Sequence, residues 1–265
     1  MKRRTGSLLF TACAALLFLA PLAAQAPAPA LPSVGLAPSD IRMGTFYDGA
    51  RLEVTGSIAS GSGVVVVIRG PEIEEAFNKK GKIGPLWYNA AKVEISGVPS
   101  LFLCFTSDAL SGLLSREALD AGQLDEEAIR AQMKVRPPEQ DHPTVRDNYL
   151  SLKRQQGIYK VTEGTVKLGA ESAGSREFTL GLSWPKKAPP QAYEVRVYEC
   201  RGGAVVGQAS APLRVEEVGF PARMTEMASN QPYLYGLIAV VVAMIVGLGI
   251  DFLASKFGKK GVAAH

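Results

Sequence analysis

The sequence has few of the residues from which catalytic and metal sites are built. It contains 2 histidines and 3 cysteines. His265 is the last residue and His142 stands alone in mid-chain, so a site with several histidine ligands is excluded. No spacing typical of zinc-binding cysteines, of a serine nucleophile or of a phosphate-binding loop occurs. We therefore expect a protein that is not an enzyme and that has no catalytic residues, no metal and no cofactor.

The sequence also lacks a strong charge of one sign outside its two ends. The formal net charge is +4, from 29 basic and 25 acidic residues. Setting aside the basic residues at the ends and Asp251 leaves 23 basic and 24 acidic residues. A near-neutral region lacks the positive surface that binds nucleic acid, so we expect no nucleic-acid partner. The basic residues at the ends are Lys2, Arg3, Arg4, Lys256, Lys259 and Lys260.

One long apolar run is present, over residues 233–254, and it carries no charge before Asp251. About 20 apolar residues that rise ~1.5 Å each match a hydrocarbon core of ~30 Å. In lipid, a helix satisfies its own backbone polar groups. The run therefore predicts one membrane-spanning helix in contact with the lipid bilayer. A helix buried in a protein core is the weaker alternative, because such a helix rarely stays uncharged for so long.

The residues at the two ends of this run predict its orientation. Tyr233 and Tyr235 stand at one end, where interfacial aromatic residues are typical, and lysines follow the other end. Basic flanks stay in the cytoplasm. We therefore place the tail, residues 255–265, in the cytoplasm and the bulk of the chain on the far side of the membrane.

The N-terminus has the pattern of a secretory signal peptide. Three basic residues precede an apolar stretch from Leu8 to Ala24, and small residues and prolines follow it. We predict a signal peptide and a Pro/Ala-rich leader over residues 1–30. The apolar stretch is long enough that an uncleaved anchor is an alternative. Both versions deliver the middle of the chain across the membrane.

Strand patterns dominate the region between these ends. Residues 51–58 alternate between apolar and polar side chains, as a half-buried strand does. Residues 64–68 (VVVVI) are apolar on both faces, which predicts a central strand covered on both sides. Residues 77–82 (FNKKGK) have the composition of a hairpin turn. Strand patterns return from Ile158 onward, and short strands separated by turns indicate an immunoglobulin-like sandwich.

A helical segment separates the two strand-rich regions. Leu110, Leu113 and Leu114 have helical spacing, Thr144 with Asp147 resembles a capping box, and Gly157 is placed to end a helix. The fold class is therefore mainly β, with immunoglobulin-like sandwich units, a helical insertion and one C-terminal transmembrane helix. The sequence leaves open whether the strands form one sandwich or two. The expected order is leader (1–30), first β-rich region (39–107), helical segment (108–157), second β-rich region (158–217), linker (218–232), span (233–254) and tail (255–265).

Two cysteines, Cys104 and Cys200, remain after removal of the signal peptide. An oxidising compartment allows a disulfide between them. Strand alternation places Cys104 with Phe102 on an apolar face, whereas Cys200 shares a face with Glu194 and Arg196, which indicates a solvated face. A disulfide and two unrelated thiols are both open at this point. An enzyme that uses either thiol is the least favoured of the functional hypotheses.

Two groups of residues are candidate binding sites. Trp87 and Tyr88 form either an exposed recognition pair or, more often for such residues, part of a core. Arg69, Trp87 and Asn89 are the candidate contacts of a small anionic ligand.

The span contains a row of small residues. Ala239, Ala243 and Gly247 recur every four residues, and Asp251 extends the row. Such a row lets two spanning helices approach closely, which favours a membrane-protein partner or self-association. The alternative is that small residues are common in spans and that Asp251 reaches the headgroups near Lys256.

The chain resembles a family of alphaproteobacterial transmembrane proteins from about Ile41 to the span. This resemblance implies a Gram-negative inner-membrane protein with a periplasmic domain, and it carries over no catalytic residues. It also implies an accessory role, because members are encoded beside sulfite-exporter-like permeases. Ala192 departs from the family pattern, which has glycine in that turn. The motifs that carry the resemblance are Asp48-Gly49-Ala50, residues 64–71 (VVVVIRGP), 84–89 (GPLWYN), 98–100 (VPS), 156–159 (QGIY), 193–198 (YEVRVY), Gly219-Phe220 and 235–237 (YGL).

Two functions fit these observations. The leading hypothesis is a membrane-anchored periplasmic accessory protein that contacts an inner-membrane transporter and packs its span beside that partner. The alternative is a periplasmic domain that binds or senses a small anion.

Overall fold

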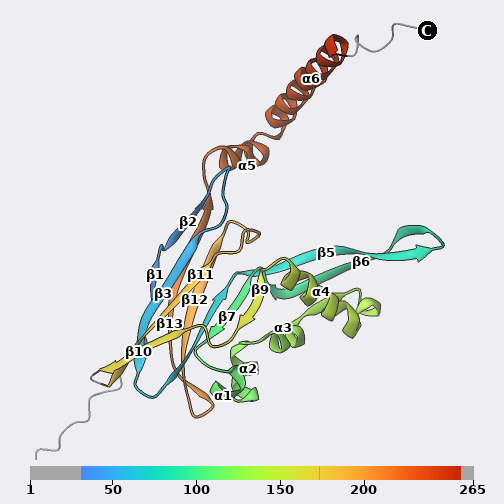
Figure 1. The fold of residues 1–265 in the computed structure, drawn as a ribbon. Coiled ribbons are helices and arrows are strands. Elements are labelled where there is room, and N and C mark those ends of the chain that lie inside the picture. The colour runs from blue at the N-terminus through green and yellow to red at the C-terminus, as the bar shows by residue number, and fades with distance from the viewer. Residues whose placement is uncertain (1–30, 173, 258–265) are drawn as a thin grey trace, which may run out of the picture.

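The computed structural model describes residues 31–172 and 174–257 (Figure 1). Strands are the commonest element, and most of them lie in two β-sheets, from which a long hairpin and a C-terminal helix extend. The predicted signal peptide and leader, residues 1–30, and the end of the predicted tail, residues 258–265, lie outside the described residues.

The larger sheet is built around β4 (Gly63–Arg69). β4 pairs antiparallel with β12 (Ala192–Arg201) on one side and with β7 (Phe102–Thr106) on the other. Every residue from Val64 to Ile68 is buried, so the prediction of a central strand covered on both faces is confirmed. The strand order is β2 (Asp40–Met43), β13 (Ala204–Glu217), β12, β4, β7 and β9 (Tyr159–Thr162).

The smaller sheet covers one face of the larger one. Its strands alternate as the sequence predicts, with Leu52 and Val54 of one strand and Phe178 and Leu180 of its neighbour buried in the shared core. Trp184 packs edge-on against Tyr193 of β12, with ring centroids 4.9 Å apart. The strand order is β1 (Gly35–Ala37), β3 (Arg51–Ala59), β11 (Ser175–Ser183) and β10 (Lys167–Ser172).

Strands from both predicted β-rich regions lie in both sheets. β3 from the first region pairs with β11 from the second, and β4 pairs with β12. The two regions therefore form a single structure, which is called the β body below. The fold class is mainly β, as the sequence predicts.

Gly56 occupies the tightest position in the smaller sheet. It lies in β3 opposite Phe178, whose ring crosses the glycine. A Cβ atom at this position would lie 2.0 Å from the backbone oxygen of Ser33 and 2.7 Å from the Phe178 ring. Glycine is therefore required at position 56, because it lets both the backbone at Ser33 and the Phe178 ring pack against β3.

A third sheet departs from the β body. β5 (Glu72–Ile83) and β6 (Leu86–Pro99) form a long hairpin that projects away from the two sheets (Figure 1), and β8 (Lys134–Arg136) pairs with its base. The predicted turn at residues 77–82 is wrong, because this segment continues as a strand from the Phe77–Val93 pair to the Lys82–Trp87 pair. Its Asn, Lys and Gly composition resembles a turn, but cross-strand pairing decides its conformation.

The helical segment lies between β7 and β9 in the chain. The spacing predicted from the leucines is confirmed, since Leu110 and Leu114 are buried. The predicted capping box at Thr144 is wrong, because the N-cap of the helix Pro143–Gln155 is His142, two residues earlier, and its side chain makes no capping hydrogen bond. Gly157, with φ +75°, follows the end of this helix as predicted. The elements are α1 (Leu110–Leu113), α2 (Arg116–Gly122), α3 (Glu126–Gln132), η1 (Pro138–Gln140) and α4 (Pro143–Gln155).

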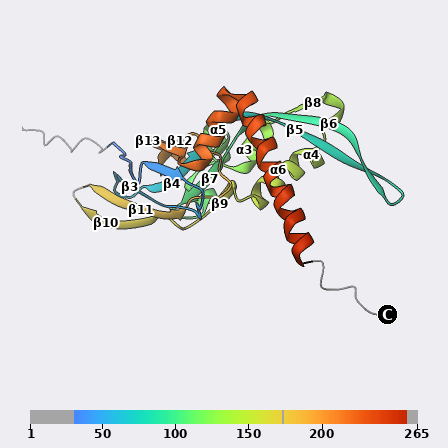
Figure 2. The same cartoon turned by 90° about the horizontal axis from the view of Figure 1, so that it is seen from above.

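The C-terminal part consists of two helices. Residues 218–232, predicted as a linker, contain α5 (Phe220–Asn230), whose first turn accommodates Pro221. α6 (Pro232–Phe257) contains the predicted span and projects from the β body (Figure 1). In both views α6 and the β5–β6 hairpin leave the β body toward the same side (Figures 1 and 2).

Replacing Gly56 with Ala is expected to destabilise the β body by about 1–3 kcal/mol, because the added methyl group overpacks the core. Gly181→Ala is the matched control, since a Cβ atom there meets nothing within 4 Å. Thermal unfolding followed by circular dichroism measures both. Equal midpoints for the two variants would contradict this account of Gly56.

Candidate functional site

The outer part of the β5–β6 hairpin, residues 78–92, differs from the rest of the surface and is called the hairpin arm below. It contains no acidic residue. Its residues are exposed except for Gly81 and Ala91, which are half-buried. Lys92 pairs with Glu94 just outside the arm, at 2.8 Å. The arm is therefore a basic projection from a near-neutral protein. Its lysines are Lys79, Lys80, Lys82 and Lys92.

The arm ends in a two-residue turn. Ile83 pairs with Leu86, which leaves Gly84 and Pro85 at the centre of the turn. Gly84 has φ +59°, and the proline ring fixes a negative φ at the next position. This combination matches a type II′ turn, which takes glycine first and suits the twist of a hairpin. The sequence thus builds a narrow tip.

The tip has one apolar face. Ile83 and Leu86 are a cross-strand pair and share this face with Tyr88. Gly81 is opposite Tyr88, and a Cβ atom at Gly81 would lie 2.7 Å from the tyrosine ring. Glycine therefore lets the tyrosine ring lie flat across the neighbouring strand.

The opposite face of the tip is basic and carries Trp87. Lys82 is paired with Trp87, and its Nζ atom lies 5.5 Å from the centroid of the indole ring. Lys80 donates a hydrogen bond to Asn89 Oδ1 at 2.5 Å. Trp87 is 67% exposed, so the structure places it in the exposed pair and not in the core. Aromatic residues are usually buried, but a residue at the tip of a projecting hairpin is too far from the core to be buried in it.

The base of the hairpin is held by α4. Lys153 is buried and donates a hydrogen bond to Glu75 Oε1 at 2.7 Å. The hydroxyl of Tyr149 donates to Glu75 Oε2 at 3.0 Å, and burial raises the pKa of Tyr149 above its ordinary value. Phe77 packs edge-on against Tyr149. This charge-assisted contact fixes the direction in which the arm leaves the body.

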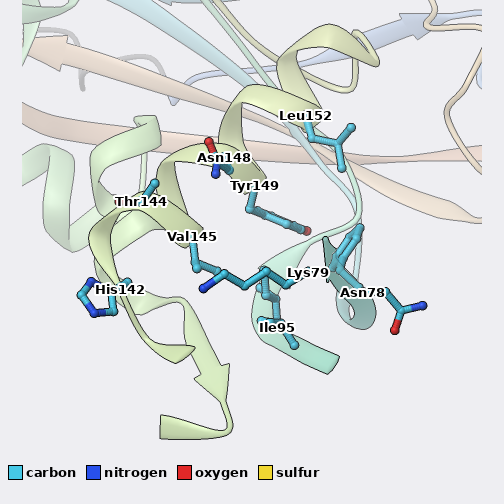
Figure 3. A pocket seen from close by; sticks show the side chains of 11 residues that line it. Asn78, Lys79, Ile95, His142, Thr144, Val145, Asn148, Tyr149 and Leu152 are labelled. Carbon is cyan, nitrogen blue, oxygen red and sulfur yellow. The ribbon is translucent and has the colours of Figure 1, made fainter. Parts of the chain in front are cut away.

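An open cavity of about 470 Å³ lies between α4 and the hairpin base (Figure 3). Its walls are mainly apolar, with Ile95 and Val145 facing each other across it. Lys79 extends over the opening toward His142, as Figure 3 shows. This cavity could not be predicted from the sequence, because its walls come from segments about fifty residues apart. The remaining lining residues are Phe77, Asn78, Val93, Thr144, Asn148, Tyr149 and Leu152.

A second cleft, of about 590 Å³, lies between the edges of the two sheets. Its apolar lining includes Leu103 from the larger sheet and Leu180 from the smaller one. Thr162 also lines the cleft, and its buried hydroxyl has no hydrogen-bond partner among the described residues. Three lysines line it as well, namely Lys160, Lys186 and Lys187.

The structure does not bring together the three residues predicted to contact an anion. Arg69 lies at the end of β4, where its Nη1 donates to Gln123 Oε1 at 2.6 Å. Burial lowers the pKa of Arg69 from its ordinary value. Trp87 and Asn89 lie in the arm, and the strand from Pro99 to Asn89 is about 30 Å long at ~3.3 Å per residue. A single small anion cannot contact all three side chains.

Cys104 and Cys200 are free, buried thiols in the structure. They flank β4 in register with Val67 and Gly63, which lie four positions apart along that strand. The expectation that the face of Cys200 is solvated is wrong, since Cys200 is 2% exposed. Burial raises the pKa of both thiols to about 12, so neither is a thiolate near neutral pH.

α6 contains the predicted packing row. Ala239, Ala243, Gly247 and Asp251 are all exposed, and nothing lies within 4 Å of a Cβ atom built at Gly247. The segment Pro232–Lys256 is long and apolar enough to cross a membrane and is the one candidate span among the described residues. The helix thus presents every face to its surroundings, as a helix in lipid does.

No cluster of metal-ligating side chains occurs in the part of the chain that the structure describes.

The hairpin arm could have been predicted from the sequence. Three lysines without an acidic neighbour, followed by a Gly-Pro turn and the apolar group Leu86-Trp87-Tyr88, indicate a basic hairpin with an apolar tip.

These features define a membrane protein with a mainly β body and a single apolar C-terminal helix. The family model described as "Putative transmembrane protein (Alph_Pro_TM)" matches residues 33–256. The chain belongs to this family, which is alphaproteobacterial by its name. None of the curated proteins compared with the chain matches it.

Proposed function

We propose that this protein is a membrane-anchored accessory protein whose β body lies in the periplasm and contacts an inner-membrane transporter. α6 carries the proposal, because it is long and apolar enough to span a bilayer and is exposed along its whole length. The resemblance to proteins encoded beside sulfite-exporter-like permeases suggests the class of the transporter. The proposed role is non-enzymatic, because the sequence lacks the common catalytic motifs.

We also propose that the β body is an immunoglobulin-like sandwich. Its two sheets pack over one core, and most of their strand pairs are antiparallel. Sandwiches of this kind serve as binding modules in many cell-surface proteins. This architecture suits a protein that acts by contact.

The proposed orientation predicts opposite results for two reporter fusions. Alkaline phosphatase fused after Gln231 should be active, because it would lie in the periplasm. The same enzyme fused after His265 should be inactive, because the lysines that follow the span stay in the cytoplasm. If only the fusion after His265 were active, the orientation would be the reverse of the one proposed, and a partner that contacts the β body in the periplasm would be ruled out.

The span is expected to pack against its partner through the row of small residues. Gly247→Leu and Ala243→Leu should each reduce recovery of the partner severalfold, because the added side chain separates the two helices. The partner is captured in native membranes with a photoreactive residue at Val240, beside the row, and is identified by mass spectrometry. A second copy of this chain as the captured neighbour would indicate self-association.

Gly249→Leu is the matched control for Gly247→Leu. It makes the same change two residues further on, where the side chain points to another side of the helix. A Cβ atom at either glycine meets nothing within 4 Å in the structure, so neither change disturbs the fold. Unchanged capture with Gly247→Leu and Ala243→Leu would show that the span is only an anchor.

The alternative function is the binding of a small anion, and the lysine-lined cleft between the sheets favours it. The cleft combines Lys160 and Lys187 with the unpartnered hydroxyl of Thr162 over an apolar floor. This arrangement suits an anion that carries an apolar group, such as an alkyl sulfonate, better than inorganic sulfate.

Thermal shifts of the full chain in nanodiscs test this alternative with sulfite, sulfate and alkyl sulfonates. A ligand at 100 times its Kd adds ~2.7 kcal/mol of stability, so a raised unfolding temperature is expected for the sulfonates. Lys160→Glu should abolish the shift, whereas Lys167→Glu, an exposed lysine of β10, should retain it. The alternative fails if none of these anions shifts the transition.

A further inference from the structure

We propose that the tip of the hairpin arm is a second membrane contact. In this proposal Ile83, Leu86 and Trp87 enter the interfacial layer of the bilayer that α6 crosses, and the lysines of the arm bind anionic headgroups. The proposal requires only that α6 anchors the chain. It depends neither on the orientation nor on the partner proposed above.

The exposure of the tip is the first observation that supports this contact. Ile83 is 68% exposed, Leu86 is 72% exposed and Trp87 is 67% exposed. Single exposed apolar side chains are common, but here they follow one another across a turn with Tyr88 beside them. The arm keeps them away from the core, so the β body cannot cover them.

The arrangement of charge around the tip is the second observation. Lys80 and Lys82 lie on the face opposite Ile83 and Leu86, and no acidic residue occurs in residues 78–92. Apolar residues on one face with lysines on the other are typical of segments that lie in the interface of anionic membranes. Tryptophan prefers the same layer, with its ring among the headgroups.

The position of the arm is the third observation. It projects from the β body on the same side as α6 in both views (Figures 1 and 2). The six residue steps from Lys92 to Leu86 carry the tip about 20 Å outward at ~3.3 Å each. The contact of Lys153 with Glu75 at the base holds the arm in this direction. An anchored chain can therefore bring the tip to the membrane surface.

The size of the tip favours lipid over a protein partner. A stable protein interface buries ~800 Å² on each side and relies on a well-packed centre. A two-residue turn with four apolar side chains falls short of that area. Insertion into the fluid interfacial layer requires no matching pocket, and lysines suit scattered headgroups because each binds as a point charge.

Trp87 itself reports the contact in the full chain. The other tryptophan, Trp184, is 2% exposed and serves as an internal reference for folding. The chain is placed in nanodiscs of zwitterionic phosphatidylcholine, with or without anionic phosphatidylglycerol. The emission of Trp87 is the difference between the wild type and Trp87→Phe. In the anionic bilayer we expect emission at shorter wavelength, loss of most of it with brominated acyl chains, and protection from acrylamide.

Charge reversal tests the role of the lysines. Lys80→Glu combined with Lys82→Glu should restore most of the Trp87 emission in the anionic brominated bilayer, whereas Lys167→Glu should not. Unchanged Trp184 emission shows that each variant is folded.

The proposal is overturned if Trp87 remains open to acrylamide and unquenched by brominated lipid in both bilayers. Protection of Trp87 in native membranes but not in pure lipid would overturn it as well, and would assign the tip to a protein partner.

Discussion

Burial of residues 64–68 of β4 is the constraint on which the rest of the structure depends. A strand that is apolar on both faces must be shielded from water on each face by another layer of the protein. The smaller sheet covers one face, and the helical segment covers the other, where the Leu113 side chain closes over Gly63. The helical segment is therefore a structural layer of the β body. This cover also explains why Cys104 and Cys200, on the strands that flank β4, are inaccessible thiols.

The base and the outer part of the β5–β6 hairpin are stabilised by different contacts. Near its base, Val93 and Ile95 are buried, and the salt bridge between Lys153 and Glu75 ties it to α4. Beyond Lys92 the hairpin is exposed, so cross-strand pairs maintain the arm, together with one hydrogen bond from Lys79 to Gln140 near its base. The apolar helix α6, the arm and the lysine-lined cleft are thus formed by different residues of the chain.

Predictions based on local pattern agree well with the structure. The buried strand at residues 64–68, the alternation of β3 and the helix end at Gly157 follow from residue type and spacing. The failures arise where distant partners decide. Residues 77–82 resemble a turn in composition, yet their partners on β6 make them a strand. Arg69 and Trp87 are close in sequence, but an extended hairpin separates them. The residues that line each of the two cavities come from segments that are far apart in sequence.

Pro32 and α5 lie near opposite ends of β13. Pro32 lies against Gly207, and β13 continues for ten residues from there to Glu217, beside α5. That distance is about 33 Å at ~3.3 Å per residue. The length of β13 therefore separates the first described residues from the helix that is long enough to cross a membrane.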